Sequence, residues 1–363
     1  MRRIRIFPVL LPVVLAACLP AAAQLSSAPP DPLARIRAAA KGNTEACSAT
    51  GETLCEQVAP KIIANAQGDS PLSENLRRLN DELKGVAGRE AEARAVSWAV
   101  AAFRDAGLDA HIEKFADAKS SPADLGNVTA EIRGREKSDE WVLVGAPLDT
   151  QPNNENSCDA ASVIEAARDI QRTGVLPRRS IRFVLFTGNE TDMTGSWAYV
   201  RSHREELDRA RAAIVFDSEC LRVTGYAMNG RRDIEPGLRE AMKPIESFGA
   251  GNYFSGARLG TDNYDFLVEG VPTLAATQTP SSNRPGPPAT PGKPEKIDIA
   301  DLKRNTAIVA VTVFGIAERA APIGPRQSRS QIKSLLETSG LERDMKGTSL
   351  WTLWESGERG RLP

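Results

Sequence analysis

The chain has 363 residues, of which 41% are hydrophobic and 26% are charged, a composition typical of a globular protein rather than a disordered or fibrous one. With 46 Lys and Arg against 47 Asp and Glu, the formal net charge is −1. A protein that binds the nucleic-acid backbone carries a basic surplus, so nucleic acid is not an expected partner. The chain has two histidines, His111 and His203, which limits any chemistry that depends on imidazole.

The N-terminus has the pattern of an export signal. Three arginines among the first five residues precede an apolar run over residues 6–17, which is too short to span a membrane as a helix. Residues 15–18 (LAAC) fit a lipoprotein signal over 1–17 with lipidation of Cys18, whereas residues 21–23 (AAA) fit cleavage of a signal peptide over 1–23. We therefore expect an exported protein, in the periplasm or lipid-anchored in the bacterial envelope, that meets the membrane only through Cys18.

Export makes disulfides possible. Cys47 and Cys55 lie close together in a polar part of the segment 24–70, and Cys158 and Cys220 are the other possible pair. Spacing alone does not distinguish disulfides from buried free thiols.

The remaining elements alternate between helix-like and strand-like patterns. Helices are predicted near 54–66, within 71–107, and over 160–173, 199–212, 234–243 and 299–318; strands over 110–115, 127–133, 141–146, 181–187 and 213–216; and a Pro-rich loop over 279–294. This alternation predicts an α/β domain over 71–320, with three α/β/α layers and a mostly parallel central sheet. A helical tail, 321–363, follows, with a helix near 330–338 and two tryptophans that we expect to pack on the domain.

Acidic side chains follow the predicted strands. Asp149, Glu155, Glu190 and Asp217 lie at or just beyond strand ends, where the ligands of open α/β sheets bind. Converging carboxylates of this kind indicate a cation site; the alternative is that they are solvated acids of surface loops.

Three segments resemble a known family. Residues 142–150 (VLVGAPLDT), 181–200 (IRFVLFTGNETDMTGSWAYV) and 259–272 (LGTDNYDFLVEGVP) are similar to motifs of the two-zinc aminopeptidases, metallopeptidase family twenty-eight, which includes carboxypeptidase Q-like enzymes and relatives of glutaminyl cyclase. The resemblance covers roughly residues 70–320. It implies a zinc-exopeptidase-like fold.

The resemblance also assigns positions to the metal ligands. The first His of the family falls on Pro147, and Asp149, which would orient that His, has nothing left to orient. The bridging acid falls on Glu155, with Asp159 as the lesser candidate. The later acid ligand matches Asp217.

The catalytic pair and the last histidine are also altered. The general base falls on Asn189 and the following ligand on Glu190. The final His falls on Asn263, or on Pro288 where carboxypeptidase Q-like members supply it. An amide cannot take a proton from a metal-bound water, and zinc loses its preferred imidazole ligands.

The resemblance therefore implies a metallo-exopeptidase fold without intact catalytic residues. We expect a protein that has lost zinc binding and peptidase activity, needs no cofactor, and binds peptides or an envelope protein. The alternative is an active metallo-exopeptidase whose carboxylates Glu155, Glu190 and Asp217 hold zinc or another divalent cation. An unrelated sugar- or peptide-binding domain is a third possibility. In the family fold Cys158 and Cys220 would flank the former metal site, as a disulfide or as neighbouring thiols.

Overall fold

The computed structural model describes residues 51–115, 125–148, 157–188, 193–218, 220–257, 259–278 and 297–362. The α-helices are α2 (Gly51–Gln67), α3 (Leu72–Leu83), α4 (Gly88–Asp105), α5 (Ser157–Arg172), α6 (Thr194–Ser202), α7 (Glu235–Met242), α8 (Asn263–Val268), α9 (Ile299–Glu318), α10 (Arg329–Ser339), α11 (Leu341–Lys346) and α12 (Leu350–Glu355). Short 3₁₀ helices are η1 (Arg204–Arg209), η2 (Arg232–Ile234) and η3 (Lys243–Phe248).

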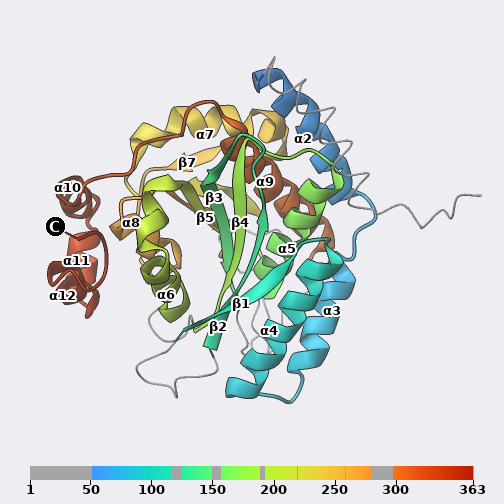
Figure 1. Ribbon diagram of the computed structural model, residues 1–363, viewed down its shortest axis with the longest axis horizontal. Helices are drawn as coiled ribbons and strands as arrows, with labels where there is room; N and C mark the ends of the chain where they lie inside the picture. The colour runs from blue at the N-terminus through green and yellow to red at the C-terminus, as the bar shows by residue number, and fades with distance from the viewer. Residues whose placement is uncertain are drawn as a thin grey trace, which may run out of the picture.

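The strands form a single twisted sheet in the centre of the molecule (Figure 1). They are β1 (Ala110–Phe115), β2 (Leu125–Ile132), β3 (Lys137–Pro147), β4 (Arg179–Phe186), β5 (Ala210–Val215), β6 (Val223–Ala227), β7 (Asn252–Phe254) and β8 (Thr273–Gln278), in the order β1-β2-β4-β3-β5-β8-β6-β7. The central strands β4, β3, β5 and β8 are parallel to one another, whereas the pairs β1–β2, β2–β4 and β6–β8 are antiparallel. The predicted "mostly parallel" sheet is therefore a mixed sheet with a parallel centre.

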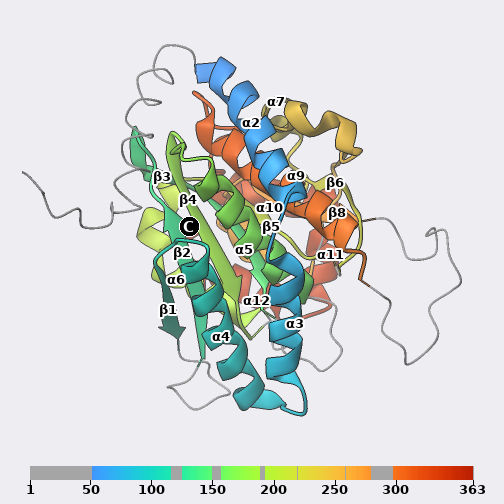
Figure 2. The ribbon, with the colours of Figure 1, turned by 90° about the vertical axis from the view of Figure 1, so that its right-hand side faces the viewer.

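Alternation along the central strands sends side chains into two cores. Val142 and Val144 face the larger core under α2, α3, α4, α5 and α9, and Figure 2 shows these helices side by side over one face of the sheet. Trp141 and Leu143 face the other core, which α6, η1 and α8 cover. The predicted three-layer α/β/α arrangement is confirmed. Strand residues that are buried on both faces explain why these runs are almost continuously apolar.

One predicted helix is wrong. Residues 199–212 were expected to be helical, but α6 ends at Ser202, η1 follows, and β5 begins at Ala210. The alanine-rich start of β5 favours a helix locally, but its backbone pairs with β3 instead, with Val142 opposite Ala212. The helical spacing over 71–107 belongs to two helices, α3 and α4.

The segments before and after the α/β domain both pack on it. α2, from the segment 24–70, contributes Val58 and Ile62 to the larger core. The C-terminal helices α10, α11 and α12 stack together beside α8 (Figure 1), and Trp354 is buried in the core that they share with α8. The tail packs on the domain, as predicted for its tryptophans.

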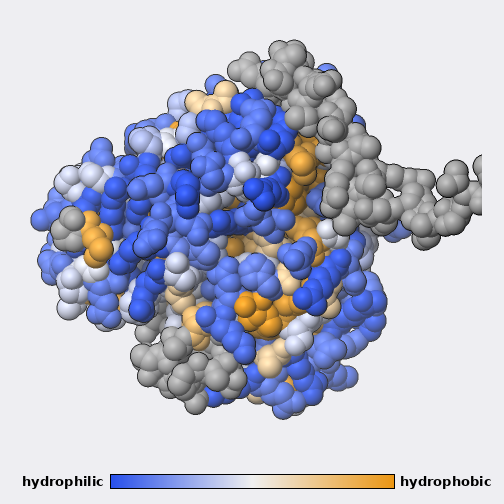
Figure 3. Space-filling view, in the orientation of Figure 1, coloured by the Kyte–Doolittle hydropathy of each residue, from blue (hydrophilic) through white to orange (hydrophobic). Residues whose placement is uncertain are grey.

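The predicted signal peptide, Cys18 and Cys47 lie outside the described residues, as does the side chain of Cys55. Within the described part, no helix has the length and apolar character needed to span a bilayer. The face shown in Figure 3 is mostly hydrophilic, with a hydrophobic area where the edge strand β1 and α4 lie. Ile112 of β1 is 42% exposed.

Candidate functional site

The carboxyl ends of β3 and β5 place two of the predicted positions next to each other. Pro147 is the last residue of β3 and is buried, and Asp217 comes two residues after β5. The two strands are parallel neighbours with Gly145 opposite Val215, and the Phe216 amide donates to the Gly145 carbonyl oxygen at 2.8 Å. The same register brings the segments of Pro147 and Asp217 to one edge of the sheet.

The start of α5 is fastened to the segment after β5. Cys158 and Cys220 form a disulfide with their Cα atoms 5.4 Å apart, which is one of the two pairings considered from the sequence. Beside it, the Asp159 carboxylate accepts from the Ser218 amide at 2.7 Å and from the Ser218 hydroxyl at 2.5 Å. Asp159, the lesser candidate for the bridging ligand, is therefore engaged with Ser218.

The segment between β4 and α6 is fixed at both ends. Buried Asn127 of β2 accepts from the Thr187 amide at 3.2 Å and donates to the Gly195 carbonyl at 2.9 Å. A Cβ on Gly195 would lie 2.2 Å from the Thr187 carbonyl oxygen, so only glycine allows α6 to start this close to the strand. Met193, the residue before α6, has a left-handed backbone with φ of 57°.

The beginning of α8 adds a buried carboxylate to this edge. Asp262 and Asn263 are both buried, and Asn263 is the first residue of α8. Burial raises the pKa of Asp262 to about 7; the Ser196 hydroxyl opposes this rise, and the carboxylates of Asp217 and Asp265 add to it. The Asn263 side-chain oxygen accepts from the Thr261 hydroxyl, and its amide nitrogen has no hydrogen-bond partner in the described part of the chain.

The structure thus brings Pro147, Asp217, Asn263 and the Cys158–Cys220 disulfide to elements that meet at the carboxyl edge of the sheet. The other predicted site residues, Asp149, Glu155, Asn189, Glu190 and Pro288, lie outside the described residues. Among the described side chains, no three of His, Cys, Asp or Glu are grouped as metal ligands.

Both histidines lie elsewhere, around Glu113 of β1. His203, between α6 and η1, places Nε2 2.9 Å from the Glu113 carboxylate and Nδ1 3.4 Å from Glu206. His111 lies two residues before Glu113 on the same strand, with Nε2 3.7 Å from its carboxylate. They form an ion-pair cluster at the sheet's first edge strand, not part of the candidate site.

Sequence reasoning missed three residues that hold the site's helices. Asp265 of α8 accepts from the Ser196 hydroxyl at 2.8 Å and from the Arg359 guanidinium at 2.7 and 2.8 Å. Arg359 is 94 residues away in sequence. The one signal in the sequence was the charge of Asp265 among the apolar residues of α8.

The comparison with protein families identifies the class. The profile described as Peptidase family M28 matches residues 127–312, which span β2 to α9 and include every described site position. The chain belongs to peptidase family M28.

Individual relatives are similar to this chain in sequence, and solved structures have the same fold. Carboxypeptidase Q of Rattus norvegicus is 28% identical over 160 residues, which are 43% of this chain and 34% of the relative. The chain thus matches about a third of the length of its curated relatives. A crystal structure of a peptidase M28 precursor from Shewanella amazonensis has a TM-score of 0.63 at 17% identity and covers 76% of this chain and 100% of that one. The LapA aminopeptidase of Legionella pneumophila has a TM-score of 0.55 at 14% identity and covers 74% and 76%.

Proposed function

We propose that this chain is an M28 protein that has lost zinc binding and peptidase activity and acts as a binding or scaffolding protein at the cell envelope. The observation that carries the proposal is the buried proline at the end of β3. Pro147 stands at the strand end where the family resemblance places a zinc-binding histidine, and its side chain has no donor atom.

The start of α8 supports the same conclusion. Asn263 stands at one of the two positions, Pro288 being the other, where the resemblance places the second histidine, and its side-chain oxygen is engaged with Thr261. Its amide nitrogen carries hydrogens and has no free lone pair, so it is not a zinc ligand. The residues at these two positions do not fit a zinc pair held in the manner of the family.

The surroundings are compatible with a site that no longer needs a metal to hold it together. The Cys158–Cys220 disulfide and the bonds between Asp159 and Ser218 connect α5 to the segment of Asp217 through the chain's own atoms. The disulfide also agrees with export, since such bonds persist in oxidising compartments such as the periplasm. The ligands of this protein would then be peptides or an envelope protein, and it would contact the membrane only through a lipid at Cys18.

The experiment that tests the proposal is zinc retention by the full mature chain. The protein is incubated with zinc, dialysed exhaustively, and its metal content measured beside a zinc aminopeptidase carried through the same steps. We expect the aminopeptidase to retain zinc and this chain to retain none, and we expect no hydrolysis of aminoacyl or carboxyl-terminal peptide substrates.

Asp217→Ala is the matched control. One or two zinc ions per wild-type chain, lost in Asp217→Ala together with a chelator-sensitive exopeptidase activity, would overturn the proposal. That outcome would establish the alternative, an active metallo-exopeptidase held by Glu155, Glu190 and Asp217. Zinc retained equally by both proteins, without activity, would overturn the claim that zinc binding is lost and would place the ion away from Asp217.

A further inference from the structure

The chain beyond residue 320 contains a feature that neither the family match nor the proposed function uses. The match ends at residue 312, yet α8, which starts at the candidate site, has its buried charges paired with arginines beyond that limit. Asp265 lies in α8 and Glu269 is the residue that ends it, four positions later and still with helical backbone angles, so the two project from the same side. Both carboxylate side chains are 1% exposed.

Asp265 is held in a complete set of bonds. The Arg359 guanidinium meets its two oxygens with Nε at 2.7 Å and Nη2 at 2.8 Å, and the Arg359 side chain is also 1% exposed. The Arg359 guanidinium carbon lies 4.8 Å from the centre of the Trp197 ring and 5.3 Å from that of Tyr264. A planar guanidinium can grip a carboxylate with two parallel bonds and stack on aromatic rings at once, whereas a lysine cannot.

The same carboxylate connects two helices of the site. Ser196, in the first turn of α6, donates to Asp265 at 2.8 Å, and α6 begins just after the segment that carries Asn189 and Glu190. Asp265 lies two residues after Asn263 on α8. Arg359 therefore stabilises the carboxylate through which α6 and α8 are bonded to each other.

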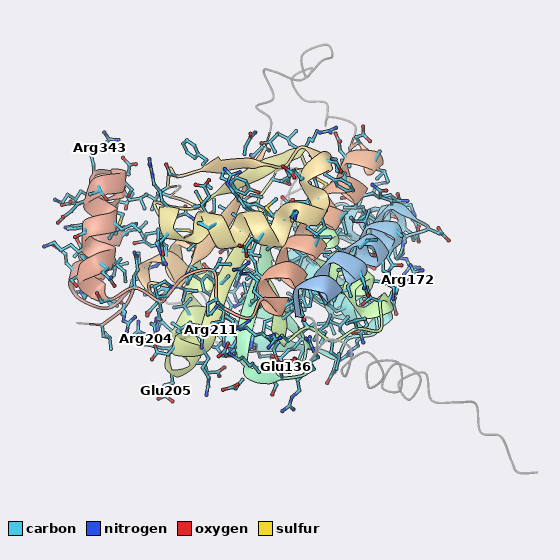
Figure 4. The ribbon with its side chains drawn as sticks, turned by 90° about the horizontal axis from the view of Figure 1, so that it is seen from above. Glu136, Arg172, Arg204, Glu205, Arg211 and Arg343 are labelled. Carbon is cyan, nitrogen blue, oxygen red and sulfur yellow. A yellow bond between two sulfur atoms is a disulfide. The ribbon has the colours of Figure 1, made fainter. Side chains whose placement is uncertain are left out.

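The other carboxylate ties the far end of α8. Glu269 pairs with Arg326 at 2.8 Å and with Arg204 of η1 at 3.1 Å. Arg204, labelled in Figure 4, lies on the side of the molecule that carries the C-terminal helices. In addition, the Arg361 amide donates to the Val268 carbonyl at 2.9 Å. The chain beyond residue 320 thus bonds to α8 at Asp265 and Val268, and to Glu269, the residue after the helix.

We propose that Arg359 is a positioning residue of the candidate site, and that the C-terminal segment 329–362 is part of the site's framework rather than an appendage. Through Asp265 it fixes the starts of α6 and α8, and with them the rim on which Asn263 stands. The inference takes from the proposed function only that this edge of the sheet is the functional site.

The test compares local amide hydrogen exchange in the full chain for wild type, Arg359→Gln, Arg359→Lys and the double variant Asp265→Asn/Arg359→Gln. The matched control is Arg361→Gln, because that side chain bonds the Gln327 carbonyl and not α8. We expect amides over 193–197 and 261–266 to exchange at least about tenfold faster in Arg359→Gln, with strands β3 to β5 unchanged and Arg361→Gln like wild type. Lysine should restore the protection only in part.

The double variant separates positioning from overall stability. It leaves no unpaired buried charge, so its melting temperature should return toward that of wild type. Amide exchange over 261–266 should nevertheless stay fast in the double variant, because the two hydrogen bonds from Arg359 to Asp265 are still missing. Wild-type protection over 261–266 in the double variant, or faster exchange spread evenly over β3 to β5, would overturn the inference. The zinc measurement has no bearing on these outcomes, so the two proposals fail separately.

Discussion

The Cys158–Cys220 disulfide allows a quantitative prediction. The bond closes a loop with a sequence separation of 62 residues between α5 and the segment after β5. Cross-linking a loop of this length lowers the entropy of the unfolded chain by an amount worth about 4 kcal/mol at 25 °C. We therefore expect reduction to lower the free energy of unfolding by about 4 kcal/mol, and the melting temperature by roughly 5–10 °C.

The measurement is urea unfolding of the mature chain with and without a phosphine reductant, followed by circular dichroism. A Cys47→Ser/Cys55→Ser variant is the control, because it keeps the Cys158–Cys220 bond and should lose as much stability on reduction as wild type does. A variant in which Cys47, Cys55, Cys158 and Cys220 are all replaced should show no response. If reduction lowered the free energy of unfolding by less than about 1 kcal/mol in both wild type and control, the reasoning would be refuted, since the Cys158–Cys220 disulfide would then not constrain the unfolded chain.

Three further predictions concern buried charges. Burial, and secondarily the neighbouring Glu165, raises the pKa of Asp169 to about 8. The unfolded chain loses this proton near pH 4 and the folded chain only near pH 8, so Asp169 lowers the free energy of unfolding increasingly as pH rises between these values. In urea titrations across pH, Asp169→Asn should be more stable than wild type by about 1–3 kcal/mol at neutral pH, and this advantage should shrink in acid. Burial alone would lower the pKa of His203, but its bonds to Glu113 and Glu206 raise the pKa overall. The contribution of protonated His203 to the free energy of unfolding is therefore complete below about pH 6.5 and is lost as pH rises through the raised pKa. His203→Gln should be less stable than wild type near pH 6, and the urea unfolding curves of the two proteins should converge in alkali. Glu318, whose side chain is fully buried, accepts from Arg135 at 2.6 Å, so Glu318→Gln should lower the free energy of unfolding by about 3 kcal/mol, whereas an unchanged midpoint would mean that Glu136 suffices as the partner of Arg135.

Much of the fold could be predicted because its signals are local. α9 was predicted with the bounds that the structure gives, since a long apolar run follows Asp298, whose side chain caps the helix by accepting from the Ala300 amide. The buried central strands could also be predicted, because each is an apolar run in the sequence. β6, β7 and β8 were not predicted, because they are short and depend on partners far away in sequence, as where Ala227 lies opposite Ala275.

The site divides in the same way. The positions of Pro147, Asp217 and Asn263 at one edge of the sheet could be predicted, since the motifs that carry them end strands or begin helices in a known order. The bond between Arg359 and Asp265 could not, because nothing near either residue specifies a partner 94 residues distant. Long-range ion pairs follow from tertiary packing, and tertiary packing is what single-sequence patterns leave out.

The ion pairs of Arg326 with Glu269 and of Arg359 with Asp265 also bear on where a truncated form of this protein should end. A chain cut at residue 312, the limit of the family match, would keep Asp265 and Glu269 but lose Arg326 and Arg359, and would expose the apolar side of α8. Asp265 would then lie within an apolar surface without its arginine, and Glu269 would keep Arg204 as its remaining partner, a state that favours protonation of Asp265, unfolding of α8 or association with other chains. The part of the chain that the family match covers is therefore shorter than the part whose buried charges are paired, and fragments for study should extend past Arg359.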